Sequence, residues 1–165
     1  MDPELIAAAA RVLDANRAAG RMVAVAESCT GGLVAAALTE IAGSSDVFER
    51  GFVTYSNEAK MEAIGVNQDI LVTFGAVSVA VAWAMAQGAL QHSHADIAVA
   101  ITGIAGPAGG SEKKPVGTVV FARAVRGDDP DRVVADVRNF GDLGRSEIRR
   151  QAALVALELL MPVAE

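Results

Sequence analysis

A serine stands where an apolar run of the sequence gives way to small polar residues and paired glycines. Met22–Ala26 is apolar, and Glu27–Gly32 follows it directly, ahead of an alanine-rich helical stretch. This order predicts a buried strand leading into a helix N-terminus, whose free amide N–H groups attract a phosphate or a developing oxyanion. Ser28 is therefore a candidate nucleophile. The alternative is that Ser28 or Thr30 only caps the helix.

A tyrosine and a lysine five positions apart could activate such a serine. A serine hydroxyl is a poor nucleophile unless a base takes its proton, and no histidine lies near a motif. Lys60 could be that base if desolvation or neighbouring cations lower its pKa, with Tyr55 as relay or orienting group. The alternative is that Glu58 and Lys60 lie on a solvated helix face.

A glycine-rich stretch and the arginines of the last helix could hold an anionic ligand. Thr102–Ser111 carries four glycines after an apolar strand, and its backbone can come close to a ligand. It matches neither the P-loop nor the dinucleotide fingerprint, so an ordinary surface loop is the alternative. Arg145, Arg149 and Arg150 begin the last helix, and one of them could bind a phosphate.

Metal and disulfide chemistry are not indicated. Cys29 is the one cysteine of the sequence, which excludes an intramolecular disulfide and a multi-cysteine metal site. It could be a nucleophile itself, but small single cysteines more often serve packing. His92 and His94 are too few for a metal cluster, and we interpret them as structural residues near a helix C-terminus.

The pattern of elements predicts an α/β fold that would position these residues. Helices are expected from Pro3 to Gly20, from Gly32 to Ile41, from Ser56 onward, over Val77–Gln91 and over Arg145–Leu160. Strands are expected over 22–26, Phe52–Tyr55 and Ala95–Ile101, and a hairpin is expected from Val116–Val125 and Arg132–Val137. We therefore predict a three-layer α/β/α sandwich whose mixed sheet contains an antiparallel hairpin.

Length and composition limit the classes of protein. The 165 residues, 52% of them hydrophobic, are predicted to form a single domain spanning 1–165. A net charge of −6 and 4% aromatic residues argue against nucleic-acid binding. No run of about 20 apolar residues and no signal peptide is evident, so we expect a cytoplasmic protein without a membrane partner.

Taken together, the motifs resemble the CinA C-terminal domain family of nicotinamide mononucleotide deamidases. The resemblance covers nearly the whole chain, and six motifs in the same order are far more specific than any one of them. They are Ala26–Gly32, Ala42–Ser45, Phe48–Lys60, Gly75–Ser78, Thr102–Pro107 and Lys114–Val119.

The resemblance implies hydrolysis of the carboxamide of nicotinamide mononucleotide to nicotinic acid mononucleotide and ammonia, with no metal or organic cofactor. It implies Ser28 as nucleophile, with Lys60 and Tyr55 as its activating partners. From the position of Ser28 before a helix, we also expect N–H groups at the start of that helix to act as oxyanion donors. The resemblance also implicates Thr102 and an arginine of the last helix, for which Arg149 is the best match and Arg145 and Arg150 are alternatives. The full set expected to bind the substrate is Thr30, Gly31, Gly32, Thr102, Gly103, Gly106 and Arg149.

Two other functions are compatible with these residues. One is a nucleotide-binding regulatory module of the same fold without catalysis, and the other is a serine amidase acting on amides that are not nucleotides. A binding module needs the glycine loops but has no need of a tyrosine and a lysine converging on a serine. From general experience with small α/β enzymes we also expect a homo-oligomer, a dimer.

Overall fold

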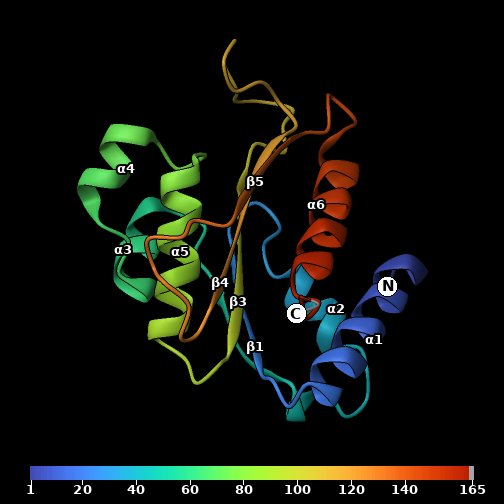
Figure 1. The fold of residues 1–165 in the computed structure, drawn as a ribbon. Helices are drawn as coiled ribbons and strands as arrows, with labels where there is room; N and C mark the ends of the chain where they lie inside the picture. The colour runs from blue at the N-terminus through green and yellow to red at the C-terminus, as the bar shows by residue number, and fades with distance from the viewer. Residues whose placement is uncertain (164–165) are drawn as a thin grey trace.

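The computed structural model describes residues 1–163 and has a five-stranded sheet at its centre (Figure 1). In spatial order the strands are β2 (Phe48–Val53), β1 (Val23–Glu27), β3 (Ile97–Gly103), β4 (Thr118–Val125) and β5 (Ala135–Asn139). Strand β1 is parallel to β2 and β3, whereas β4 is antiparallel to β3 and to β5. The predicted mixed sheet with an antiparallel hairpin is confirmed.

Helices cover both faces of the sheet (Figure 1). On one face lie α1 (Pro3–Ala18), α2 (Leu33–Thr39) and α6 (Arg145–Leu159), which contact one another. On the other face lie α3 (Asn57–Ile64), α4 (Gln68–Phe74) and α5 (Val79–Gln91). A short 3-10 turn, Ser44–Asp46, precedes β2. The predicted three-layer α/β/α sandwich is therefore confirmed.

The two faces of the central strands carry side chains of different size. Side chains alternate along a strand, so Val23 and Val25 of β1 pack toward α1, α2 and α6, while Ala24 and Ala26 pack toward α5. Strands β3 and β4 also turn small residues toward α5. They are Ala98, Ala100, Ala122 and Ala124. These short side chains let α5 lie close to the sheet.

A glycine inside α5 makes room for α3. A Cβ added at Gly88 would lie 2.0 Å from the carbonyl oxygen of Ile64, the last residue of α3. No side chain fits such a gap, because the atom it would meet belongs to the backbone. Gly88 therefore permits the close approach of α3 and α5.

Local capping signals set the starts of four helices. The side chains of Asp2, Ser56, Asn67 and Ser78 each accept a hydrogen bond from backbone N–H groups in the first turn of α1, α3, α4 and α5. The predicted helix starts at Asp2-Pro3 and at Ser56 are confirmed.

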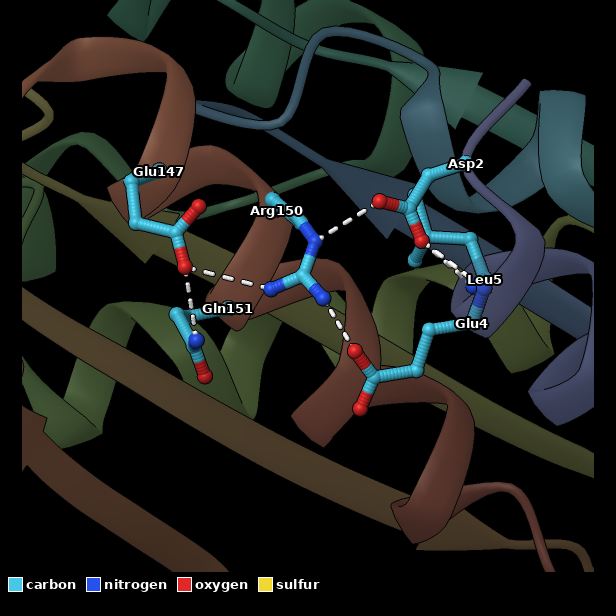
Figure 2. A network of polar contacts seen from close by, with 6 residues as sticks. All are labelled: Asp2, Glu4, Leu5, Glu147, Arg150 and Gln151. Carbon is cyan, nitrogen blue, oxygen red and sulfur yellow. Dashed lines mark hydrogen bonds and ion pairs between the residues drawn. The ribbon is translucent and has the colours of Figure 1, made fainter.

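Arg150 links α6 to the start of α1 (Figure 2). Its guanidinium donates to Asp2 at 2.9 Å, to Glu4, and to Glu147 on its own helix at 3.1 Å. These side chains are partly exposed, and such ion pairs are typically worth about 0–1 kcal/mol each. The network orients Arg150 toward α1.

Two strands differ from the predictions by more than two residues at one end, and the other strands differ by one or two residues. The strand predicted over Phe52–Tyr55 is β2, which begins at Phe48 and ends at Val53, because pairing with β1 recruits residues of weak strand propensity such as Gly51. The second hairpin strand, predicted over Arg132–Val137, is β5 at Ala135–Asn139, because it pairs with the first half of β4. In both cases the partner strand sets the limits.

Helix α4 was not predicted, although it has local signals. Asn67 caps it through a 2.7 Å hydrogen bond from Asp69 N–H, and Gly75 ends it with a positive φ. A cap, an acidic first turn and a final glycine are the usual marks of a short helix. None of the helices within residues 1–163 is long and apolar enough to span a membrane.

Candidate active site

The three segments singled out in the sequence meet at one edge of the sheet. Strands β1, β2 and β3 are parallel, so their carboxyl ends lie together, and ligand crevices of open α/β sheets form at such edges. A cavity of about 280 Å³ opens there. It is lined by residues that follow each of the three strands, by the turn before α5 and by the start of α6: Ser28, Cys29, Tyr55, Lys60, Ala76, Val77, Thr102–Gly106, Ala108–Gly110 and Arg145.

Lys60 and Ser28 form the central contact of this cavity. Lys60 Nζ lies 3.0 Å from Ser28 Oγ, 2.8 Å from the carbonyl oxygen of Thr54 and 3.2 Å from that of Tyr55. The lysine side chain is 1% exposed, although Lys60 lies on a helix whose other positions are mostly exposed. The alternative of a solvated helix face is therefore wrong for Lys60.

The burial of Lys60 favours the neutral amine. An ammonium donates three hydrogens, whereas a neutral amine donates two and keeps a lone pair. The carbonyls of Thr54 and Tyr55 can only accept, whereas the hydroxyl of Ser28 accepts from an ammonium or donates to the lone pair of a neutral amine. Within residues 1–163 no carboxylate forms an ion pair with Lys60. Burial lowers the pKa of Lys60, while the nearby Cys29 opposes this to a smaller extent.

The start of α2 is already occupied by a protein carboxylate. Glu27 is fully buried, and its two oxygens accept hydrogen bonds from the N–H groups of Val34 at 3.0 Å and Ala35 at 3.1 Å. The expectation that the first N–H groups of this helix would serve as oxyanion donors is therefore wrong. Across the described residues, the N–H groups of Cys29 and Thr30 have no hydrogen bond to another residue, and they adjoin Ser28.

Tyr55 reaches the cavity but does not contact the serine–lysine pair through its phenol. Its side chain is exposed, and its hydroxyl accepts a hydrogen bond from Arg145 Nη2 at 2.9 Å. Only its backbone carbonyl touches Lys60. The phenol is thus placed to orient Arg145, and the described contacts give it no relay path between Ser28 and Lys60.

The three arginines of α6 have different surroundings. Arg145 lines the cavity and donates to the carbonyl of Gly106 at 2.8 Å. Arg149 donates to the carbonyls of Cys29 at 3.1 Å and Thr30 at 3.0 Å, which braces the nucleophile turn. Arg150 lies in the network of Figure 2. Of the three, Arg145 is the one placed to meet a ligand, and not Arg149, the best match from the sequence.

The remaining predicted binding residues divide into two groups. Thr102, Gly103 and Gly106 line the cavity, and Thr102 Oγ1 donates to the carbonyl of Ala76 at 2.8 Å. Thr30, Gly31 and Gly32 are not among the lining residues. The two glycines have positive φ values of 58° and 100°, which the tight turn between β1 and α2 requires. Their geometry indicates a role in shaping the turn.

Cys29 lines the cavity beside Ser28 but is held as a thiol. Burial raises its pKa to about 11, and the charge of Glu27 adds to this. A protonated thiol is a weak nucleophile. Ser28 therefore stays the better candidate.

Sequence reasoning missed Glu27, Thr54 and the turn before α5. A signal existed for Glu27, because an acid close before a helix start is a capping pattern. The turn residues Ala76 and Val77 lie in the motif Gly75–Ser78, and Thr54 lies in Phe48–Lys60. Their side chains did not mark them as site residues, because they act through backbone or shape. Within the described residues, no cluster of three or more His, Cys, Asp or Glu could hold a metal ion.

A buried serine–lysine pair at the carboxyl edge of an α/β sheet, facing a glycine-rich loop, defines the class of nucleophilic hydrolases that work without histidine. The chain belongs to the CinA C-terminal domain family, whose pattern matches residues 6–164.

Similar proteins match most of this chain. The nicotinamide-nucleotide amidohydrolase PncC of Escherichia coli is 53% identical over 160 residues, covering 96% of this chain and 94% of the relative. A CinA-like protein of Syntrophobacter fumaroxidans is 50% identical over 89% of this chain but only 34% of its own length. The crystal structure of the competence/damage inducible protein CihA from Agrobacterium tumefaciens superposes with a TM-score of 0.92 at 51% identity, covering 97% and 95% of the two chains.

Proposed function

We propose that this protein is a nicotinamide-nucleotide amidohydrolase that hydrolyses the carboxamide of nicotinamide mononucleotide through a serine nucleophile. The supporting observation is the contact of the buried Lys60 amine with Ser28 Oγ at 3.0 Å, with two carbonyls occupying the other positions around Nζ. The similarity to PncC over nearly the whole chain supports the substrate and the reaction.

In the first half of the reaction, Lys60 Nζ takes the proton of the Ser28 hydroxyl as Oγ bonds to the amide carbon. The carbonyl oxygen becomes an oxyanion, and the free N–H group of Cys29, which lines the cavity beside Ser28, is its donor. One such donor is typically worth about 3 kcal/mol in other hydrolases. The C–N bond then breaks, and the nitrogen leaves as ammonia with the proton that Lys60 had taken.

In the second half, water cleaves the acyl-enzyme. Lys60 takes a proton from the attacking water, and the new hydroxide oxygen bonds to the acyl carbon. The ester bond to Ser28 Oγ breaks, and Lys60 returns its proton to the serine. The products are nicotinic acid mononucleotide and the free enzyme. Each half uses the same amine once as base and once as acid.

The ribose phosphate is held by Arg145 and the glycine-rich loop. Arg145 is a permanent cation on the cavity wall, and hydrogen bonds to Tyr55 Oη and the Gly106 carbonyl orient it. In the described structure the N–H groups of Ala105 and Gly106 have no hydrogen bond to another residue and lie on the same wall. Backbone N–H groups and a guanidinium together are a common phosphate site.

Three other expectations are also proposals. We propose that residues 1–165 form a single domain, although 164–165 lie outside the described residues. We also propose that the protein is a homodimer and that it is located in the cytoplasm. Size-exclusion chromatography with light scattering and cell fractionation test the last two.

The test is ammonia release from nicotinamide mononucleotide by the purified, chelator-treated protein and by Ser28→Ala. We expect release by the wild type alone, with a large preference for the mononucleotide over free nicotinamide because a phosphate anchor supplies binding energy. Full turnover by Ser28→Ala would refute the nucleophile assignment. Ligand binding without turnover by the wild type would instead favour a regulatory module.

A further inference from the structure

Glu27 connects the two halves of the serine–lysine pair. It is the last residue of β1, immediately before Ser28, and it is fully buried. Its carboxylate holds the N–H groups of Val34 and Ala35, while its backbone carbonyl accepts a 2.9 Å hydrogen bond from Thr54 N–H. The carbonyl of Thr54 in turn accepts from Lys60 Nζ. One residue thus reaches both the turn that carries the nucleophile and the segment that holds the amine.

A buried acid is a costly way to cap a helix. Removing a carboxylate from water is unfavourable unless its oxygens are hydrogen-bonded, and an uncharged serine or asparagine caps exposed helices well. The N-cap of α2, Gly32, has no side chain that could do this work. The carboxylate of Glu27 instead reaches forward across the five-residue turn 28–32 to the N–H groups of Val34 and Ala35, which braces the turn at both ends.

We infer that Glu27 is a positioning residue for Ser28, an inference that rests on the proposed function. Its carboxylate fixes the turn 28–32 against α2, which keeps Ser28 Oγ within hydrogen-bonding distance of Lys60 Nζ. It also occupies the N-terminus of α2, so the substrate phosphate is directed to Arg145 rather than to this helix. The oxyanion donor is consequently the N–H group of Cys29 in the turn and not an N–H group of the helix.

A second property follows from the same carboxylate. The charge of Glu27 contributes to the raised pKa of the Cys29 thiol, next to the nucleophile. Removing that charge is expected to lower the pKa of this thiol from its value of about 11. A general loosening of the fold would also lower the pKa of this thiol, because burial is the larger cause of its raised value. Glu27→Asp, which keeps the charge, therefore separates the effect of the charge from that of loosening.

The experiment compares Glu27→Gln, Glu27→Asp and a control, Asp2→Asn. The glutamine keeps the shape but has one acceptor oxygen for two N–H groups and no charge. The aspartate keeps the charge on a shorter side chain. Asp2 is the matched control because it also caps a helix through two backbone N–H groups, at α1.

For Glu27→Gln we expect kcat for nicotinamide mononucleotide to fall by about 100-fold with KM nearly unchanged, because small displacements of reacting groups cost roughly this much. Glu27→Asp should recover part of kcat, and Asp2→Asn should keep it. The ultraviolet absorbance of the Cys29 thiolate should appear at lower pH in Glu27→Gln alone.

The inference is overturned if Glu27→Gln retains wild-type kcat, or if Glu27→Asp is no better than Glu27→Gln. If Glu27→Gln does not fold, Glu27→Asp is compared with the wild type, and a wild-type kcat in Glu27→Asp would overturn the inference. A wild-type protein that releases no ammonia would instead refute the proposed function. In that case an unchanged thiolate titration in Glu27→Gln would still overturn the inference about Glu27.

Discussion

Replacing Lys60 by methionine separates the amine from the space it fills. Methionine is unbranched and of similar length, so the buried volume stays occupied. The change removes the only basic nitrogen within hydrogen-bonding distance of Ser28 Oγ in the described residues. General-base catalysis is typically worth 10²–10⁴ in rate. Because the same amine serves as base and acid in each half of the proposed reaction, we expect kcat to fall by about 10³-fold or more, roughly 4 kcal/mol.

The folded state should lose less than catalysis does. The carbonyls of Thr54 and Tyr55 lose their donor in Lys60→Met, and a buried unpaired acceptor costs about 1–3 kcal/mol. The variant also no longer buries a polar amine, which offsets part of this cost. We expect the free energy of unfolding to drop by about 2 kcal/mol or less, so the variant should be folded and testable.

The pH dependence gives the sharpest check. Because the proposed base is neutral Lys60, wild-type kcat/KM should rise with pH through the lowered pKa of Lys60 and level off above it. Between that pKa and the ordinary value of 10.5 the unfolded chain binds a proton that the folded protein does not. The free energy of unfolding should therefore rise with pH across this window, and the rise should be absent in Lys60→Met. Cys29 titrates with the opposite slope and its pKa responds to Lys60, so both proteins are compared in a Cys29→Ala background.

The assay is ammonia release from nicotinamide mononucleotide across pH, with urea unfolding of both proteins at the same pH values. The reasoning is refuted if Lys60→Met keeps turnover within tenfold of the wild type. It is also refuted if wild-type kcat/KM is flat with pH while substrate binding is saturable.

Two further predictions follow from the geometry. Arg145→Gln should raise KM for nicotinamide mononucleotide by roughly 10- to 100-fold, the value of one charge-assisted hydrogen bond. Arg150→Gln should lower stability and leave KM unchanged. Steady-state kinetics in which both variants have the same KM would contradict this prediction. Gly88→Ala should lower both the free energy of unfolding and kcat, because its Cβ would meet the Ile64 carbonyl at the end of the helix that carries Lys60. Overpacking typically costs 1–3 kcal/mol, whereas alanine gains about 1 kcal/mol of helix propensity over glycine. If urea unfolding showed Gly88→Ala to be more stable than the wild type, the close contact of α5 with the Ile64 carbonyl would not restrict this position.

Much of the fold could be predicted because its signals are local. The apolar run before Ser28, the cap at Ser56 and the turn residues of the hairpin each lie within a few positions of what they control. The same holds for Ser28, which adjoins the strand end that presents it. The ends of a strand could not be predicted where they depend on pairing with a strand that is distant in the sequence. The extent of β2 depends on its register with β1 and not on its own composition.

The candidate site shows the same division. The sequence by itself determined that a serine, a lysine and a glycine-rich loop all follow strands or begin helices, because strand ends and caps are encoded in neighbouring residues. Only the tertiary structure decided which arginine reaches the cavity. Arg145 and Arg149 are one turn apart on the same helix face, so the depth at which α6 packs against the sheet selects between them. Burial is likewise a property of the whole molecule, and burial is what lowers the pKa of Lys60 and confines Glu27 to the start of α2.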